Sequence, residues 1–263
     1  MSFPLKTKCL RCLFASRAAV SIFVLGSFAA FSSAADTNSV ATISAPTQSQ
    51  ALNWFLAARS NYLAQAGNAT SAWKFAEACF EWAEYATNST QREALATEGI
   101  AAAKAVTEMH PDTGVGHFFL AMNKGQLART KSLGALALVK EMEQSFIRAI
   151  KLDPTFDYAA PHRSLGMLYL DAPGWPASIG SKSKARRHLE KAVELAPDYP
   201  TNHLTLLDAY LRWGDASALA TAMKRYRAIL PKAKEKYGGP VWQNSWRNWD
   251  SEWRTILEKS EEL

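Results

Sequence analysis

A tryptophan stripe near the C-terminus has the side-chain type and the spacing that a binding surface needs. Its successive indoles lie four, three and four residues apart, which places all of them on one face of a helix. Such a face either docks a capping helix onto the rest of the fold or forms an aromatic surface for an apolar ligand or a second protomer. We predict that part of the stripe is exposed. Its members are Trp242, Trp246, Trp249 and Trp253.

A second candidate group lies on the helix predicted over residues 117–127 and mixes apolar bulk with polar groups. A few polar groups in an apolar groove would orient a ligand, whereas ordinary packing between helices is the other interpretation of the aromatic members. The members are His117, Phe118, Asn123 and Gln126. A further candidate is Trp175, next to the stiff Pro176, which either contacts a partner or packs over the top of a helix pair.

Motifs for catalysis are absent from the sequence. It contains no Gly-x-Ser-x-Gly and no His-Glu-x-x-His, and nothing supports a hydrolase built on a helical scaffold. The segment 174–183 resembles a phosphate loop only superficially, because its glycines are spaced wrongly and no strand precedes it. None of the five histidines forms a pair four residues apart. We therefore predict a protein that is not an enzyme, with no metal and no cofactor.

The first 35 residues have the layout of a secretory signal peptide. Four basic residues precede an apolar run over 18–31, and the small residues Ser33, Ala34 and Ala35 follow it. We expect cleavage after Ala35 and export to the periplasm, with an uncleaved membrane anchor as the alternative. No lipobox precedes either cysteine of this segment, so a lipoprotein is not indicated. Residues 36–50 are small and polar, and we predict a flexible tether there.

The composition favours a helical protein with a sizeable core. Apolar residues make up 48% of the 263 residues and charged residues 21%, and β-branched runs are almost absent. The net charge is +6, of which the leader carries four, so the remaining +2 is weak support for a nucleic-acid partner. Only Cys79 lies beyond the leader, and it has no partner for an internal disulfide.

Helix pairs that end at proline recur along the chain and predict an all-α solenoid. Prolines close successive predicted pairs at Pro111, Pro154, Pro197 and Pro231. The clearest copy has the marks of a tetratricopeptide repeat, with an inserted loop around 173–179 between its two helices. The marks are Leu165, Gly166, Tyr169, Ala185, Leu189, Ala192 and Pro197.

These patterns give a domain plan and leave one alternative open. We predict a tetratricopeptide-like repeat domain over 51–237 with inserted loops between helices, followed by a Trp-rich capping helix over 238–263. A bundle of unrelated amphipathic helices is the alternative fold.

Several stretches resemble the T-component family of TRAP transporters (TatT-like proteins). They are 116–127, 134–141 and 160–166, followed by the insert Gly-Trp-Pro-Ala-Ser-Ile-Gly over 174–180. The resemblance implies a periplasmic helical-repeat protein that engages a substrate-binding protein, encloses an apolar channel for a small molecule and assembles as a trimer. The other function left open is a general tetratricopeptide adaptor of the cell envelope without a channel. The array also distantly resembles eukaryotic regulators of microtubule dynamics, and the predicted leader argues against that assignment.

Overall fold

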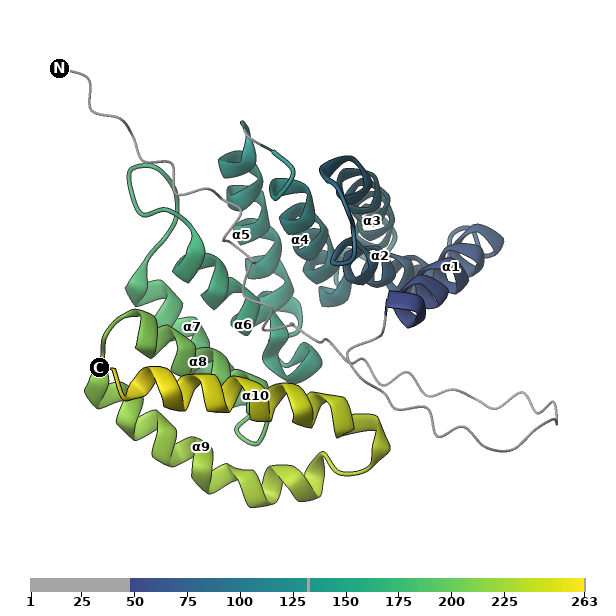
Figure 1. Cartoon of the computed structure of the whole chain (residues 1–263). Helices are drawn as coiled ribbons and strands as arrows, with labels where there is room; N and C mark the ends of the chain where they lie inside the picture. Colours follow the sequence, from purple (N-terminus) through teal and green to yellow (C-terminus); the bar gives the residue numbers. More distant parts are fainter. Residues whose placement is uncertain (1–47, 132, 263) are drawn as a thin grey trace. The chain divides into compact units, whose positions relative to one another are not determined.

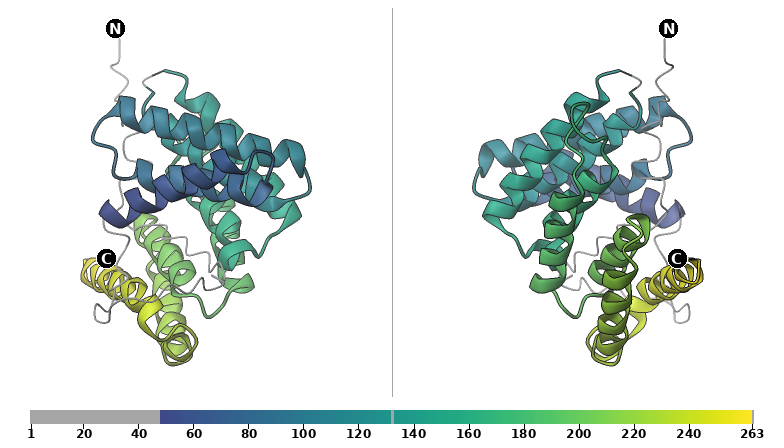
Figure 2. Two further views of the ribbon diagram at one scale, coloured as in Figure 1. Left: turned by 90° about the vertical axis from the view of Figure 1, so that its right-hand side faces the viewer. Right: turned by 90° about the vertical axis from the view of Figure 1, so that its left-hand side faces the viewer.

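The computed structural model describes residues 48–131 and 133–262, and over these residues the chain is helical (Figure 1). The described residues form no strand, only one isolated bridge between Gly174 and Gly180. The predicted all-α helical-repeat solenoid is therefore confirmed. The described residues divide into two compact units that meet at Pro197 and Asp198, and Figure 2 shows the same helices from two further sides.

Unit 1 ends at Pro197 and is built from helix hairpins. Neighbouring helices in the chain pack against each other, α2 on α3, α4 on α5 and α6 on α7, and α1 packs on α2. The short connections make each such pair antiparallel. The helices are α1 (Gln48–Ala64), α2 (Ala69–Ala83), α3 (Ser89–Met109), α4 (Gly114–Ala128), α5 (Ala135–Leu152), α6 (Phe156–Asp171) and α7 (Lys182–Leu195).

Unit 2 begins at Asp198 and contains three α-helices and a short 3-10 helix. Helix α8 (Pro200–Arg212) packs against both α9 (Ala216–Lys236) and α10 (Gln243–Ser260), and η2 (Pro240–Trp242) leads into α10. The predicted C-terminal helix thus lies on the last hairpin of this unit, where it covers α8.

Proline positions agree with the sequence analysis at three places and disagree at a fourth. Pro111, Pro154 and Pro197 each come two residues after the last residue of α3, α5 and α7. Pro231 was predicted to close a helix pair, and this prediction is wrong because α9 continues through it to Lys236. A proline inside a helix removes only one backbone hydrogen bond, and the flanking turns of α9 are held by residues buried in unit 2, among them Tyr226 and Ala233.

One other boundary differs from the predicted one. Helix α1 begins at Gln48, inside the segment predicted as tether. The predicted signal peptide and the rest of the tether lie outside the described residues. Among the residues that are described, no helix combines the length and the apolar character that crossing a bilayer requires.

Four helices begin at a side chain that caps them. The side-chain oxygens of Asn68, Asn88, Ser181 and Asp215 each accept a hydrogen bond from the backbone N–H three residues later. Each cap satisfies one of the backbone donors that a helix start leaves without a partner. The cap at Ser181 lies at the end of the inserted loop, directly before α7.

Glycines let the paired helices of unit 1 approach closely. A Cβ atom on Gly166 of α6 would lie 2.6 Å from Cδ2 of Leu189 on α7, and one on Gly116 of α4 would lie 2.8 Å from Cγ1 of Val106 on α3. Both distances are far below ordinary carbon–carbon contact. The repeat mark at Gly166 therefore has the role that its position predicts, because a larger residue would separate the two helices.

Replacing Gly166 with alanine tests this close approach. We expect Gly166→Ala to lower the free energy of unfolding by about 1–3 kcal/mol, because Leu189 is fully buried and cannot move aside. The loss should appear although alanine is the better helix former by about 1 kcal/mol. Chemical denaturation followed by circular dichroism measures it. Gly174→Ala is the matched control, since its Cβ would meet only an ordinary contact at 3.8 Å. Equal stability of the two variants would contradict the packing argument.

Candidate functional site

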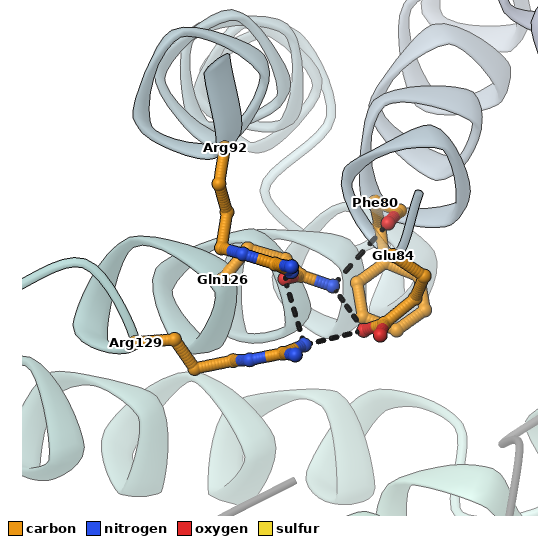
Figure 3. Close-up of polar contacts among 5 residues, drawn as sticks. All are labelled: Phe80, Glu84, Arg92, Gln126 and Arg129. Atoms are coloured by element: carbon orange, nitrogen blue, oxygen red, sulfur yellow. Dashed lines mark hydrogen bonds and ion pairs between the residues drawn. The ribbon is translucent and has the colours of Figure 1, made fainter. Parts of the chain in front are cut away.

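Helices α2, α3 and α4 are tied together by a polar network around the buried Gln126 (Figure 3). The side-chain amide of Gln126 donates to the carbonyl oxygen of Phe80 at 3.3 Å and to the carboxylate of Glu84 at 2.5 Å. Its oxygen accepts from Arg92 at 2.8 Å and from Arg129 at 3.1 Å, and Arg129 also pairs with Glu84 at 2.7 Å. Burial and the neighbouring Arg129 lower the pKa of Arg92. The network satisfies a glutamine that is 1% exposed, so it stabilises the fold.

A second amide of α4 makes a similar tie one turn earlier. The Asn123 side-chain nitrogen donates to the carbonyl oxygens of Ala76 at 2.8 Å and Phe119 at 2.9 Å. Gly99 of α3 makes room for this side chain, because a Cβ there would lie 2.1 Å from the Asn123 oxygen. Asn123 is fully buried, and its amide spans the space between two helices.

Three members of the predicted groove-lining group on α4 are buried and contact other parts of unit 1. Asn123 and Gln126 bond neighbouring helices, and Phe118 is fully buried against the rings of Phe146 and Phe156. Physically, amides on an inner helix face find backbone carbonyls of the next helix before they find a ligand. His117 is half-buried, and burial lowers its pKa. Its role as a ligand contact stays a prediction.

The tryptophan stripe packs inside unit 2. Trp242 and Trp249 are buried and stack with ring centroids 6.0 Å apart. Trp242 lies in η2 and not in α10, so the four indoles do not share one helical face, and the two buried rings fill the space beside α8. The indole N–H of Trp249 donates to the Thr201 hydroxyl at 2.8 Å, and that of Trp246 donates to the Tyr237 carbonyl oxygen at 2.7 Å. Trp246 and Trp253 are half-buried, so the packing interpretation describes most of the stripe.

Trp175 has the opposite outcome. It was expected either to pack over its helix pair or to contact a partner, and its side chain is 89% exposed. Packing is thus the wrong interpretation for Trp175, and its role as a contact residue remains a prediction.

Three acidic side chains of α2 and α6 form a buried carboxyl cluster: Glu77, Glu81 and Asp157. Burial raises the pKa of Glu77 well above its ordinary value, and the charges of Glu81 and Asp157 raise it further. Burial likewise raises the pKa of Glu81 to about 8, with a further contribution from Glu84. At neutral pH Glu81 therefore holds a proton most of the time, which reduces the repulsion among the members of the cluster.

The turn that begins α6 places Asp157 in this cluster. Asp157, Tyr158 and Ala159 have positive φ angles of 44°, 55° and 64°, a backbone region that L-residues rarely adopt. Arg163 faces Asp157 with 3.8 Å between nitrogen and oxygen, and both side chains are 2% exposed. Burial raises the pKa of Asp157 to about 6 although Arg163 opposes the shift. This strained turn is held by the ion pair and by the Arg163 hydrogen bond to the Tyr158 carbonyl oxygen.

The carboxyl cluster does not amount to a metal site. Among the described residues, no three His, Cys, Asp or Glu side chains are arranged to hold a metal ion. The clearest consequence of the cluster is for stability, since it holds ionisable groups where their charged forms are disfavoured.

Two histidines that the sequence separates by 26 residues meet between α6 and α7. The Nδ1 atoms of His162 and His188 lie 3.0 Å apart, which requires that one ring donates and the other accepts. Burial lowers the pKa of both rings, that of His188 to about 4 with a contribution from His162. This hydrogen-bonded pair within one helix hairpin is a structural contact.

The basic surface of α9 is the candidate site in unit 2. This helix carries six Lys or Arg residues and one Glu. Leu219, Tyr226 and Ala233, spaced by seven, form its buried side, whereas all six basic side chains are exposed. The six are Lys224, Arg225, Arg227, Lys232, Lys234 and Lys236. We call this set the α9 basic surface.

Part of the α9 basic surface is held by contacts within unit 2. Asp198 pairs with Lys232 at 3.1 Å and with Lys236 at 3.5 Å. Arg227 and Lys234 lie over the rings of Trp253 and Trp246, at 5.4 and 5.6 Å from the ring centroids. The remaining pair, Lys224 and Arg225, has neither an ion pair nor a ring contact with the residues that the structure describes. These two charges are available to an acidic partner.

The sequence analysis missed this surface because it averaged charge over the whole chain. A net charge of +2 beyond the leader hides one helix with six basic residues against a single acid. A count of charges within each predicted helix would have found it.

The carboxyl cluster predicts a pH dependence of stability. The pKa of Glu81 is about 8 in the folded chain against an ordinary 4.5, so folding takes up a proton between these values. Stability from this group is present below about pH 4.5 and is lost as the pH rises to 8. We expect Glu81→Gln to be more stable than the natural chain by about 1–3 kcal/mol at pH 8 and equal to it near pH 4. Glu108→Gln, at an exposed carboxylate of α3, should change neither value. Urea denaturation at both pH values measures the free energy of unfolding. The same change with pH in all three proteins would refute the prediction.

The histidine pair predicts the opposite dependence. The pKa of His188 is about 4 in the folded chain and 6.5 ordinarily, so protonation favours unfolding and stability declines as the pH falls from 6.5 towards 4. Between pH 7 and pH 4.5, the free energy of unfolding of His188→Gln should fall by about 1–2 kcal/mol less than that of the natural chain. Thermal unfolding at a series of pH values measures the difference. The exposed His110 provides the control variant His110→Gln, and an identical benefit from it would argue against the pair as the cause.

Comparison with known proteins corrects the assignment made from the sequence. No curated protein matches the chain. The model of a protein family described as "Regulator of microtubule dynamics protein 1-3" matches residues 39–172, just over half of the chain. Among the described residues this region comprises α1 to α6 of unit 1.

The proposed likeness to a TRAP T-component, and with it the transport role and the substrate-binding protein as partner, is therefore wrong. The alternative role as a tetratricopeptide adaptor of the envelope is not supported either. The motifs were misleading because they are not specific to one family. Unrelated helical repeats also have glycine and alanine at helix contacts and proline after helix ends, since their helices pack and end in the same way.

The distant resemblance to microtubule regulators was set aside because of the predicted leader. A leader is removed or retained independently of the fold that follows it, so it carries no information about the family of the repeats. Helices α1 to α6 give the decisive match, and this chain belongs to the regulator of microtubule dynamics protein 1-3 family.

Proposed function

We propose that this chain is a non-catalytic binding protein whose partner is an acidic protein polymer. The microtubule, which the family description names, is the polymer that we propose. The observation that carries the proposal is the family match over α1 to α6. It is supported by the α9 basic surface, which offers the positive charge that an acidic polymer would attract.

The contact is electrostatic and involves α9 directly. Lys224 and Arg225 are neighbours on the exposed side of the helix, and neither is engaged by the ion pairs or ring contacts of the described residues. The other basic residues are positioned by Asp198 and by tryptophans of α10, so the surface needs little reordering on binding. Binding through such exposed charges weakens as the salt concentration rises.

Co-sedimentation of the full chain with stabilised microtubules tests the proposal. We expect binding at an ionic strength of about 0.01 M, where the Debye length is about 30 Å. The affinity should fall several-fold at physiological salt concentration. The double variant Lys224→Gln, Arg225→Gln should bind about five- to tenfold more weakly, because it removes the two available charges. Growth and shrinkage of single microtubules should change with the natural chain and change less with this variant.

A charge-matched control separates local from overall charge. The double variant Lys104→Gln, Lys140→Gln removes the same charge from exposed positions on α3 and α5 and should bind like the natural chain. Equal weakening by both variants would point to non-specific attraction. Failure of the natural chain to sediment with microtubules at low salt would overturn the proposal.

The N-terminal segment provides an independent test. A chain that is cut after Ala35 and exported cannot meet microtubules, whereas a chain that keeps residues 1–35 and faces the cytosol can. Intact mass of the chain isolated from its own cells, together with cell fractionation, distinguishes these cases. Isolation of the cut form from an exported fraction alone would contradict the microtubule role.

A further inference from the structure

Two inter-helix loops of unit 1 present the most exposed large apolar side chains among the described residues. Trp175 lies between α6 and α7, and Leu133 lies between α4 and α5, each with 89% of its side chain exposed. Because α5 is antiparallel to both α4 and α6, the two loops lie at the same end of the helices, as Figures 1 and 2 show. We call this end the loop edge.

The loop that carries Trp175 is held firmly at its base. Gly180 donates its N–H to the Pro173 carbonyl oxygen at 2.9 Å, and Ser178 donates to the Gly174 carbonyl oxygen at 3.2 Å. Gly180 packs tightly against the opposite side of the loop, because a Cβ atom at this position would lie 2.0 Å from the Ala172 carbonyl oxygen. These contacts order the base of the loop, and the loop holds the Trp175 side chain in solvent.

The loop carrying Leu133 is likewise defined at its two ends. Thr130 and Lys131 donate their N–H groups to carbonyl oxygens of the last turn of α4. On the other side Gly134 adopts a left-handed conformation with φ of 81° and accepts the first hydrogen bond of α5. Leu133 therefore stands directly before a fixed helix start.

Positive charge surrounds the loop that carries Trp175. The start of α7 has four basic residues before its first acid, Glu190. They are Lys182, Lys184, Arg186 and Arg187. The N-terminal end of a helix also carries partial positive charge, which adds to theirs. Among nearby acids, Glu143 faces Lys184 at 3.5 Å and Glu93 pairs with Lys131, so part of the charge is balanced.

We propose that the loop edge of unit 1 docks onto the surface of an anionic lipid bilayer. Trp175 and Leu133 would enter the interface between headgroups and acyl chains, and the basic start of α7 would face the headgroups. Tryptophan is enriched at this depth of membranes because its ring is amphipathic. Clustered Lys and Arg side chains are attracted to anionic leaflets.

The shape of the loop edge favours a bilayer over a protein partner. The two apolar side chains protrude singly from separate loops, and a protein would need a matching pocket for each. A bilayer surface is continuous and deformable, so it accepts both at once.

Vesicle co-sedimentation with the full chain tests the proposal. We expect binding to phosphatidylcholine vesicles that contain phosphatidylserine and at least fivefold weaker binding to phosphatidylcholine alone. Trp175→Ala should weaken binding to the anionic vesicles about fivefold, and Trp175→Ala with Leu133→Ser should weaken it further. Lys182→Glu with Arg187→Glu should weaken binding to anionic vesicles alone. The matched control is Leu63→Ser, at a leucine of α1 that is 70% exposed, and it should bind like the natural chain.

A second readout places the indole in the membrane. Brominated lipids should quench the fluorescence of the natural chain more than that of Trp175→Phe, because the difference reports this one ring. The proposal is overturned if the natural chain ignores anionic vesicles, or if Trp175→Ala and Leu63→Ser behave alike. It is also overturned if a polyglutamate peptide binds the loop edge with the same dependence on Trp175, since the occupant would then be an acidic protein. Circular dichroism of each variant shows that it has folded.

Discussion

The close approach of helices through glycine is the constraint on which unit 1 depends. At Gly166 and Gly116 the missing Cβ atom lets one helix touch the side chains of the next, and the larger apolar residues then fill the space around the contact. Because each hairpin packs on its neighbour, an error in one spacing would shift every later helix of the unit. The buried amides of Asn123 and Gln126 tie α4 to α2 by hydrogen bonds, so packing and polar contacts together set the helix spacings of this unit.

The sequence predicted the helices well and the functional residues poorly, for a physical reason. Gly166, Leu189 and Pro197 mark repeats because local packing and helix termination act over a few residues, which a sequence pattern records directly. Whether Trp249 or Trp175 meets solvent depends on which helix lies across from it. That information is distributed over distant residues, such as Thr201 for Trp249. The pairing of His162 with His188 was hidden for the same reason.

Charge and burial divide between the two units. Unit 1 holds ionisable groups in its interior, where burial raises the pKa values of Glu77, Glu81 and Asp157 and where Arg163 lies against a strained turn. Unit 2 presents the α9 basic surface, where aromatic rings and Asp198 position part of the charge. The first arrangement lowers stability at neutral pH, whereas the second supplies long-range attraction at little cost in desolvation. A surface for recognition is therefore better placed on α9 than in the carboxyl cluster.

The contact between Gly99 and Asn123 has a consequence for how this family can vary. The asparagine oxygen occupies the volume that any side chain at position 99 would need, while its nitrogen holds the Ala76 carbonyl on a third helix. A relative with a larger residue at position 99 must carry a smaller one at position 123, and it must then satisfy the freed carbonyl in another way. The two positions should accordingly change together or remain unchanged, and divergence will be slowest where three helices share a single amide.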